Sequence, residues 1–242
     1  MYLPLINVFD SPYQIWKNEP STIDEILARL EKRTLPPKQL VKSICNHFDA
    51  ARHILEKGMD NGLEFHIDSQ LRSSGTCNFW HSQIPNQIPK PLYDYKNLYP
   101  NYNIAQVDEV INSLGLYLSE EQTLFHGGLF DDFGEYPTNK PLSASFCPQV
   151  ALRNAEWRGK AYDRGQIDIF VLKVRAPSSK VFFYNLDEEL GNEKEVLFAS
   201  GAHLRFIKRT QIRDDYRVGK IDFSLREYEK FVPVYVVEAE IS

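Results

Sequence analysis

The chain has 242 residues and a formal net charge of −5, and 43% of its residues are hydrophobic while 25% are charged. This composition supports a sizeable buried core and excludes a chain that is disordered throughout. The acidic balance argues against a protein that coats nucleic acid, although a local basic groove stays open. The three cysteines lie far apart, so they predict neither a disulfide framework nor a metal site.

The N-terminal stretch MYLPLINVFDSPYQIW has no basic start, no sustained apolar core and no small-residue cleavage site, so no secretory signal is expected. No apolar run approaches the roughly 18 residues that a membrane-spanning helix needs, and no membrane contact is expected. The sequence therefore predicts a cytoplasmic protein, or one that is delivered into the cytoplasm of a target cell by a specialised secretion machine.

The first part of the chain is expected to be mostly helix and loop. The apolar residues of 23–30 repeat at helical spacing, and Ser21 with Asp24 resembles a capping box. A second helix is expected on the apolar stripe from Val41 to Leu55, with Gly58 placed to stop it. Both stripes are expected to face the core.

From about residue 60 to 103 no clean period is visible, and proline, asparagine and aromatic residues are frequent. This pattern predicts a long ordered loop or a linker. The aromatic residues favour the ordered loop, because a free linker would expose them. We place a domain boundary near residue 95, which gives an N-terminal region of residues 1–95 and a second domain of residues 96–242.

The second domain is expected to be mostly β-structure. A short amphipathic helix is expected over 107–114, and segments rich in Val, Ile, Phe and Tyr then alternate with turn residues. The predicted strands are 123–126, 142–146, 167–174, 181–184, 195–199, 203–208 and 232–241. One helix is expected around 148–162. The fold class is therefore α+β, with a mostly helical N-terminal region followed by a mixed, mainly β domain.

Three short segments differ from ordinary strand ends. The first ends an apolar strand with His126 and Gly127, where a histidine can bind a ligand and a glycine lets the backbone approach it. The second carries Ser143 and Ser145, which share one face of a strand because side chains alternate. The third carries Glu193 and Glu195, which are expected to share a face in the same way. Taken alone, each segment also fits a turn or a solvated strand.

The order of the three segments resembles the ADP-ribosyltransferase superfamily, and specifically its arginine–serine–glutamate branch. That branch has an Arg-Gly strand, a Ser-Thr-Ser strand and a Glu-x-Glu strand. His126 stands where the branch has arginine, and Ala144 stands where threonine is usual. A histidine at the first position is typical of the diphtheria-toxin and poly(ADP-ribose) polymerase branch, so the chain resembles a hybrid. The resemblance covers about residues 105–242.

The resemblance implies that residues 96–242 form an ADP-ribosyltransferase-like split β-sandwich, a catalytic domain that breaks the nicotinamide–ribose bond of its substrate NAD. It assigns Glu195 to the ribose, where positive charge develops in the transition state. Ser143 would orient that glutamate and bind NAD, with Ser145 as a second support. Glu193 would meet the acceptor.

Further NAD contacts follow from the same resemblance. His126 would bind the adenosine-side ribose or the nicotinamide end, and Gly127 would let the backbone reach the carboxamide. Arg153 and Arg158, on the helix after the serine strand, are candidates for the pyrophosphate because arginine suits bidentate contacts. The alternative for both arginines is a solvated helix face.

The resemblance therefore implies a mono-ADP-ribosyltransferase that moves ADP-ribose from NAD to a target macromolecule and releases nicotinamide. A protein acceptor is favoured, and the Glu-x-Glu motif accompanies arginine modification in the family. The alternatives are transfer to RNA or DNA, hydrolysis of NAD alone, and a degenerate module that binds NAD or a partner without catalysis. The N-terminal region is expected to dock a target, an antidote protein or a chaperone, or to brace the catalytic domain. A toxin, a translocated effector and a phage-conflict enzyme all fit this reading.

Overall fold

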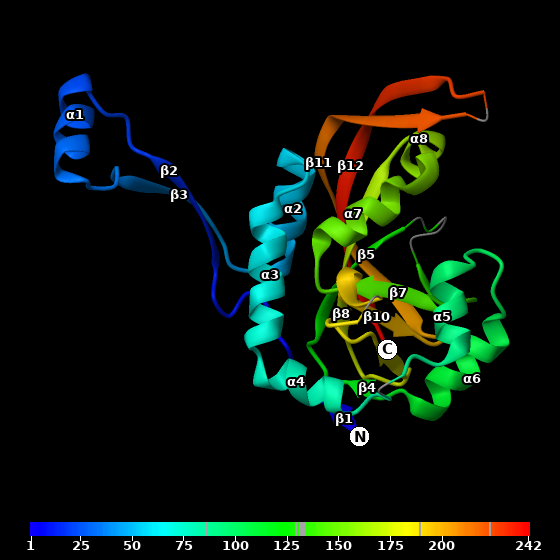
Figure 1. Ribbon diagram of the computed structural model, residues 1–242. Coiled ribbons are helices and arrows are strands. Elements are labelled where there is room, and N and C mark those ends of the chain that lie inside the picture. The colour runs from blue at the N-terminus through cyan, green and yellow to red at the C-terminus, as the bar shows by residue number, and fades with distance from the viewer. Residues whose placement is uncertain (86, 129, 131–133, 189, 223) are drawn as a thin grey trace.

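The computed structural model describes residues 1–85, 87–128, 130, 134–188, 190–222 and 224–242 (Figure 1). Its helices are α1 (Ile23–Lys32), α2 (His47–Lys57), α3 (Asn61–Ser73), α4 (Gly75–Ser82), α5 (Lys90–Asn97), α6 (Ile104–Leu114), α7 (Pro148–Glu156) and α8 (Lys160–Arg164), with short 3₁₀ turns η1 (Trp157–Gly159) and η2 (Gly191–Glu193). Its strands are β1 (Tyr2–Leu3), β2 (Tyr13–Asn18), β3 (Lys38–Ile44), β4 (Tyr117–Leu118), β5 (Thr123–Gly127), β6 (Glu135–Pro137), β7 (Leu142–Ser145), β8 (Ile167–Val174), β9 (Val181–Phe183), β10 (Glu195–Phe198), β11 (His203–Ile221) and β12 (Glu227–Ile241).

A mixed sheet forms the centre of the fold. Within the described residues it has eight strands in the order β6-β11-β12-β8-β5-β7-β10-β9. Strand β12 pairs with β8 in parallel, and the other pairs in this sheet are antiparallel. Helices lie around this sheet (Figure 1). The predicted α+β fold class is confirmed.

Each strand predicted in the second domain coincides with a strand of this sheet. The apolar, β-branched and aromatic residues of these segments place them in the core, as for β8, of which only two residues are not fully buried. Strands β11 and β12 run well beyond their predicted ends and form a long two-stranded ribbon (Figure 1). The added part of β11 is largely exposed and rich in charged residues, so it lacks the apolar alternation that predicts a strand.

The prediction of a long loop or linker over about 60–103 is wrong, because α3, α4 and α5 occupy most of this segment. Helix α3 begins at Asp60, whose carboxylate accepts hydrogen bonds from the first backbone amides of the helix. Its buried residues Leu63, Ile67 and Leu71 recur at four-residue spacing on one face. The polar residues between them masked this period. The predicted second helix is also shorter than expected, since Val41 and Ile44 belong to β3, and Gly58 ends α2 as predicted.

Helix α1 and the paired strands β2 and β3 project from the rest of the molecule (Figure 1). The helix has a capping box, but Thr22 and Glu25 form it in place of Ser21 and Asp24. None of its ten residues, all within the described chain, is buried, and Ile23 is 76% exposed. The expectation that this apolar stripe faces the core is wrong. Helical spacing shows that one face is apolar but not which surface covers it.

Two apolar clusters fix the elements around the site. The main cluster joins residues of both predicted parts of the chain, including Ile54 and Trp80 from the first and Phe125 and Val236 from the second. A further cluster packs α5 and α6 against β9 and β10. The domain boundary near residue 95 stays a prediction. Within the described residues, no helix is both long enough and apolar enough to cross a membrane.

Candidate active site

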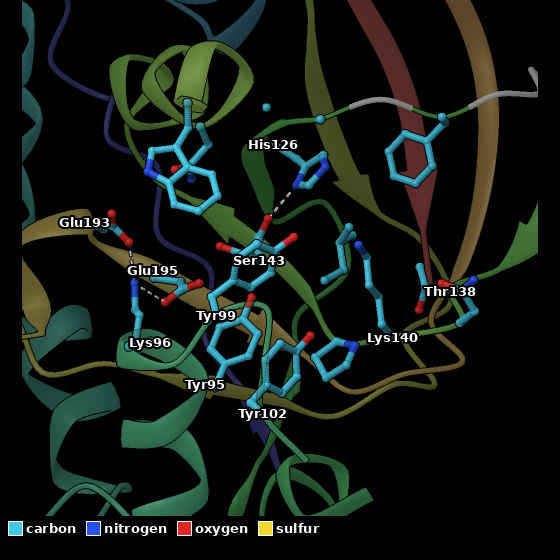
Figure 2. A pocket seen from close by; sticks show the side chains of 18 of the residues that line it. Tyr95, Lys96, Tyr99, Tyr102, His126, Thr138, Lys140, Ser143, Glu193 and Glu195 are labelled. Carbon is cyan, nitrogen blue, oxygen red and sulfur yellow. Dashed lines mark hydrogen bonds and ion pairs between the residues drawn. The ribbon is translucent and has the colours of Figure 1, made fainter. Parts of the chain in front are cut away.

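A cavity of about 860 Å³ opens over β5, β7 and the beginning of β10. Five of the residues predicted from sequence line it, namely His126, Gly127, Ser143, Glu193 and Glu195. Figure 2 shows the side chains of His126, Ser143 and the two glutamates, together with tyrosines and a lysine that α5 and the following loop contribute. The three segments that stand out in the sequence therefore converge on one cavity.

Strand pairing explains this convergence. In the antiparallel pair of β7 and β10, Ser145 lies opposite Glu195 and Ser143 lies opposite Leu197. Because side chains alternate along a strand, Ser143 and Glu195 are diagonal neighbours on the same face of the sheet. On the other side of β7, the Nδ1 atom of His126 lies 2.6 Å from the carbonyl oxygen of Ser143. Neighbouring strands thus supply all three groups.

Glu195 is a buried carboxylate at the beginning of β10, with 2% of its surface exposed. Burial raises its pKa, and the Lys96 ammonium and the Ser143 hydroxyl oppose this rise only in part. The Nζ atom of Lys96 lies 2.5 Å from Oε2 of Glu195. An anion in this position requires such a partner, because an unpaired buried charge is costly.

Lys96 on α5 contacts both glutamates of the Glu-x-Glu motif. Besides Glu195, its ammonium contacts Oε2 of Glu193, and the contacts to both are marked in Figure 2. The side chain is 12% exposed, and its ammonium lies 5.2 Å from the centre of the Tyr184 ring. Burial lowers the pKa of Lys96, but the two carboxylates outweigh burial and the net shift is upward. Lys96 therefore carries a positive charge at neutral pH.

Glu193 does not lie on the strand, so the prediction that it shares a strand face with Glu195 is wrong. It ends the turn η2, and Lys194 after it has a left-handed backbone with a φ of 50°. This turn breaks the alternation of side chains and brings Glu193 back toward Lys96. The side chain of Glu193 is 38% exposed, so this carboxylate forms the outer edge of the pair.

Ser145 is buried and is not among the described residues that line the cavity. Its hydroxyl donates to the carbonyl oxygen of Glu193 at 2.6 Å and accepts from the amide of Cys147 at 3.0 Å. Both contacts hold backbone next to the site. The hydroxyl therefore braces the turn before Glu195, and these contacts do not support the predicted role in binding NAD.

His126 is neutral and has a defined tautomer. A carbonyl oxygen only accepts, so Nδ1 of His126 donates to Ser143 and Nε2 is left as an acceptor. Burial lowers its pKa to about 4, and Lys160 and Lys140 contribute to the lowering. At neutral pH the imidazole thus offers a hydrogen-bond acceptor to a ligand, such as a ribose hydroxyl.

Gly127 is required by packing. A Cβ atom at this position would lie 1.6 Å from the carbonyl oxygen of Ala151 on α7. At Gly128 a Cβ atom would lie 2.1 Å from Nε2 of His126. The two glycines therefore let α7 and the histidine approach the strand end, which explains why this pair follows the histidine.

The two predicted pyrophosphate ligands are not among the described residues that line the cavity. Arg153 forms an ion pair with Glu64 at 3.1 Å, and the guanidinium of Arg158 lies 4.3 Å from the centre of the Trp157 ring. Helix α7 ends at Glu156, and Arg158 follows in a turn with a left-handed backbone, so the assumed helix face does not extend to it.

The cavity instead contains two other lysines, Lys140 before β7 and Lys160 at the start of α8. Burial and the charge of Lys140 lower the pKa of Lys160, which indicates that the two ammonium groups share one region. A pair of cations in a partly buried cavity suits a diphosphate. No sequence motif marked these lysines, because one lies in a loop and the other follows a break between two helices.

Aromatic side chains form one wall of the cavity, and sequence reasoning did not assign them to it. Tyr99 lies 6.0 Å from Tyr102 with nearly parallel rings and 5.6 Å from Trp157 in an edge arrangement, while Tyr95 lies 4.8 Å from Tyr102. The three tyrosines belong to α5 and the following loop, within the segment expected to wrap the second domain as a loop. The high frequency of tyrosine in this segment is the sequence feature that could have pointed to the wall. Such a wall can stack on a planar ring of a ligand.

Within the part of the chain that the structure describes, no group of three or more His, Cys, Asp or Glu side chains could hold a metal ion.

No protein-family model matches the sequence, and no curated protein matches it either. Among solved structures, the ADP-ribosyltransferase Vis of Vibrio splendidus is 16% identical with a TM-score of 0.38, and the match covers 80% of this chain and 71% of Vis. The enzymatic component C2-I of the Clostridium botulinum C2 toxin is 12% identical with a TM-score of 0.39, over 67% of this chain and 45% of C2-I. The ADP-ribosyltransferase C3larvin of Paenibacillus larvae is 10% identical with a TM-score of 0.38, over 68% of this chain and 92% of C3larvin. All three are named as ADP-ribosyltransferases or as a toxin's enzymatic component, but with TM-scores below 0.5 their likeness supports no conclusion about this chain. Membership of the superfamily that the sequence motifs resemble, and of a branch within it, stays a prediction.

Proposed function

We propose that the protein is a mono-ADP-ribosyltransferase that uses NAD as its substrate and modifies a protein. The observation that carries this proposal is the position of Glu195. It is a buried carboxylate that lines a large cavity. Its strand, β10, pairs with the strand of Ser143, β7, and His126 contacts the backbone of Ser143 from the other side of β7. A carboxylate fixed in such a place stabilises positive charge that develops on a bound substrate.

The reaction that this site supports begins with cleavage of the bond between nicotinamide and C1′ of the ribose. The bonding electrons leave with nicotinamide, and C1′ gains oxocarbenium character. Glu195 would stabilise that charge and bind the ribose 2′-hydroxyl, while Ser143 would hold the carboxylate in one orientation. The acceptor then forms a bond to C1′ and loses its proton.

The rest of the cavity suits the remaining parts of NAD. Its volume of about 860 Å³ is within the range of small-molecule sites. The ammonium groups of Lys140 and Lys160 would bind the diphosphate in place of Arg153 and Arg158. The neutral Nε2 of His126 would accept a hydrogen bond from a ribose hydroxyl, and the aromatic wall would stack on nicotinamide or adenine.

A transfer assay tests this proposal. The purified chain and its Glu195→Ala variant are incubated with labelled NAD and a cell lysate, and separate aliquots are then treated with protease and nuclease. We expect label that depends on Glu195 and that protease removes. Label that only nuclease removes would point to RNA or DNA as the acceptor. NAD binding without label and without released nicotinamide would favour a degenerate binding module and sink the proposal.

A protein partner at the N-terminal region belongs to the same proposal. The apolar face of α1 is uncovered in the isolated chain, and Leu30 on it is 69% exposed. Contiguous exposed apolar side chains are typical of interaction surfaces. This supports docking of a target, an antidote or a chaperone on the projecting arm, which pull-down with the arm residues replaced by serine would test. Action as a toxin or effector in the cytoplasm of a cell is part of this proposal.

A further inference from the structure

We infer that the acceptor is a neutral side chain of the target protein, and that Lys96 excludes a guanidinium from the site. The inference rests on the proposed function and names the chemical class of its second substrate. It replaces the arginine acceptor that the Glu-x-Glu motif favours by analogy.

Lys96 contacts carboxylate oxygens that an arginine acceptor would need. A guanidinium binds a carboxylate best with two parallel hydrogen bonds, one to each oxygen. At the outer edge of the pair, Oε2 of Glu193 already contacts the ammonium of Lys96. The same ammonium lies 2.5 Å from Oε2 of Glu195. The carboxylate that would hold an arginine acceptor is therefore left without the two free oxygens that this geometry needs.

Lys96 also opposes a guanidinium by its charge. In the proposed complex the diphosphate of NAD offsets Lys140 and Lys160, the other lysines among the described residues that line the cavity, so Lys96 is the cation beside Glu193. A guanidinium placed at Glu193 would lie close to the Lys96 ammonium, and like charges repel in a partly buried site. A neutral hydroxyl, amide or thiol does not meet this repulsion.

The contacts of α5 hold Lys96 in place. Helix α5 is anchored by Leu92, which is fully buried, and by the Tyr184 hydroxyl, which donates to the Leu92 carbonyl oxygen at 3.2 Å. The ring of Tyr184 also faces the ammonium of Lys96. If the lysine left the glutamates, it would leave the buried Glu195 without its cation, which is costly. An incoming guanidinium therefore cannot displace Lys96 without this free-energy cost.

A neutral acceptor fits the remaining proton chemistry. After the bond to nicotinamide has broken, the acceptor oxygen, nitrogen or sulfur forms the bond to C1′. Its proton passes to Oε1 of Glu193, the carboxylate oxygen that the described ion pair with Lys96 does not use. A guanidinium, in contrast, would have to lose a proton before it becomes nucleophilic, and its pKa is very high.

The test compares the full-length wild type with Lys96→Met, and with Lys90→Met as a matched control. Lys90 lies on the same helix, is 80% exposed and pairs with Asp94 away from the glutamates. Nicotinamide release that depends on Glu195 is measured first, because its absence would overturn the proposed function before any acceptor is scored. Each protein is then incubated with labelled NAD and agmatine as a guanidinium probe, and the modified side chains of lysate proteins are identified by mass spectrometry.

We expect the wild type and Lys90→Met to leave agmatine unlabelled and to modify hydroxyl, amide or thiol side chains. Lys96→Met should label agmatine on the order of tenfold faster than the wild type, at a pH where the variant releases nicotinamide. Modification of agmatine or of arginine side chains by the wild type would overturn the inference, and this arm needs no variant to fold. Label on nucleic acid alone, or nicotinamide release with water as the only acceptor, would overturn it as well.

Discussion

The ammonium of Lys96 lies 2.5 Å from Oε2 of Glu195, and this ion pair joins helix α5 to the first residue of strand β10. Glu195 is also faced by Glu193, Ser143, Tyr95 and Tyr184. Among these groups only Lys96 supplies a positive charge. Of the groups that lower the pKa of the proposed catalytic carboxylate, Lys96 therefore has the largest effect.

Lys96→Met should shift the pH dependence of nicotinamide release. Burial already raises the pKa of Glu195, and loss of the ammonium raises it further. If the reaction requires ionised Glu195, lowering the pH then reduces the rate of the variant at a higher pH than that of the wild type. We expect the acid limb of the kcat/KM profile to move to higher pH, and Lys96→Arg to restore it toward the wild type. An unchanged acid limb with lower activity throughout would indicate a purely structural role for Lys96.

His47 should make the protein sensitive to acid. Burial lowers its pKa from 6.5 to about 4, with Lys173 contributing, and its Nε2 is buried without a hydrogen-bond partner among the described residues. Between these two pH values the unfolded chain binds a proton that the folded chain does not. The free energy of unfolding should therefore fall as the pH drops from 6.5 to about 4, by up to roughly 3 kcal/mol for this group.

The comparison for this effect is His47→Phe. The imidazole packs between the rings of Phe9 and Phe125, so an aromatic replacement keeps these contacts. Urea unfolding of both proteins across this pH range should show a flatter slope for the variant. Equal slopes would contradict the account. His126 has the same direction of pKa shift and would keep a residual slope in the variant.

Serine substitutions on the apolar face of α1 should leave the stability of the isolated chain unchanged. Ile26 and Leu30 are 46% and 69% exposed, so Ile26→Ser with Leu30→Ser removes little buried surface. We expect a change of less than about 0.5 kcal/mol per site in the free energy of unfolding. Leu55→Ala in α2, where the leucine is fully buried, should cost about 2–5 kcal/mol. A large loss from the α1 pair would show that the arm packs against the body.

The sequence predicts the strands and several residues of the site better than its surroundings. Ser143 and Glu195 could be assigned because their segments resemble the Ser-x-Ser and Glu-x-Glu motifs of the ADP-ribosyltransferases, and the pairing of β7 with β10 places both on one face of the sheet. Alternation predicted the wrong position for Glu193, because Lys194, which has a left-handed backbone, lies between the strand and the turn. Alternation holds only while the backbone stays extended.

Contacts between distant parts of the chain could not be predicted in this way. Lys96 meets Glu193 across 97 positions of the sequence, and no local pattern encodes that contact. The segment around it has polar residues between its apolar ones, so the helix that carries Lys96 was expected to be loop. The tyrosines of the aromatic wall were not predicted for the same reason. The error for Arg153 is of the opposite kind. Its residue type suits a phosphate, but its position in the fold places it in an ion pair with Glu64.

The most direct test of the central claim is nicotinamide release by Glu195→Gln, measured beside the wild type and Glu193→Gln with NAD as the only substrate. The substitution keeps the size of the side chain and removes its charge. We predict that Glu195→Gln lowers kcat for release by about 100- to 1000-fold while NAD still binds, and that Glu193→Gln retains most of the release. Wild-type release that Glu195→Gln leaves intact would contradict the account, since the buried carboxylate would then have no part in breaking the bond.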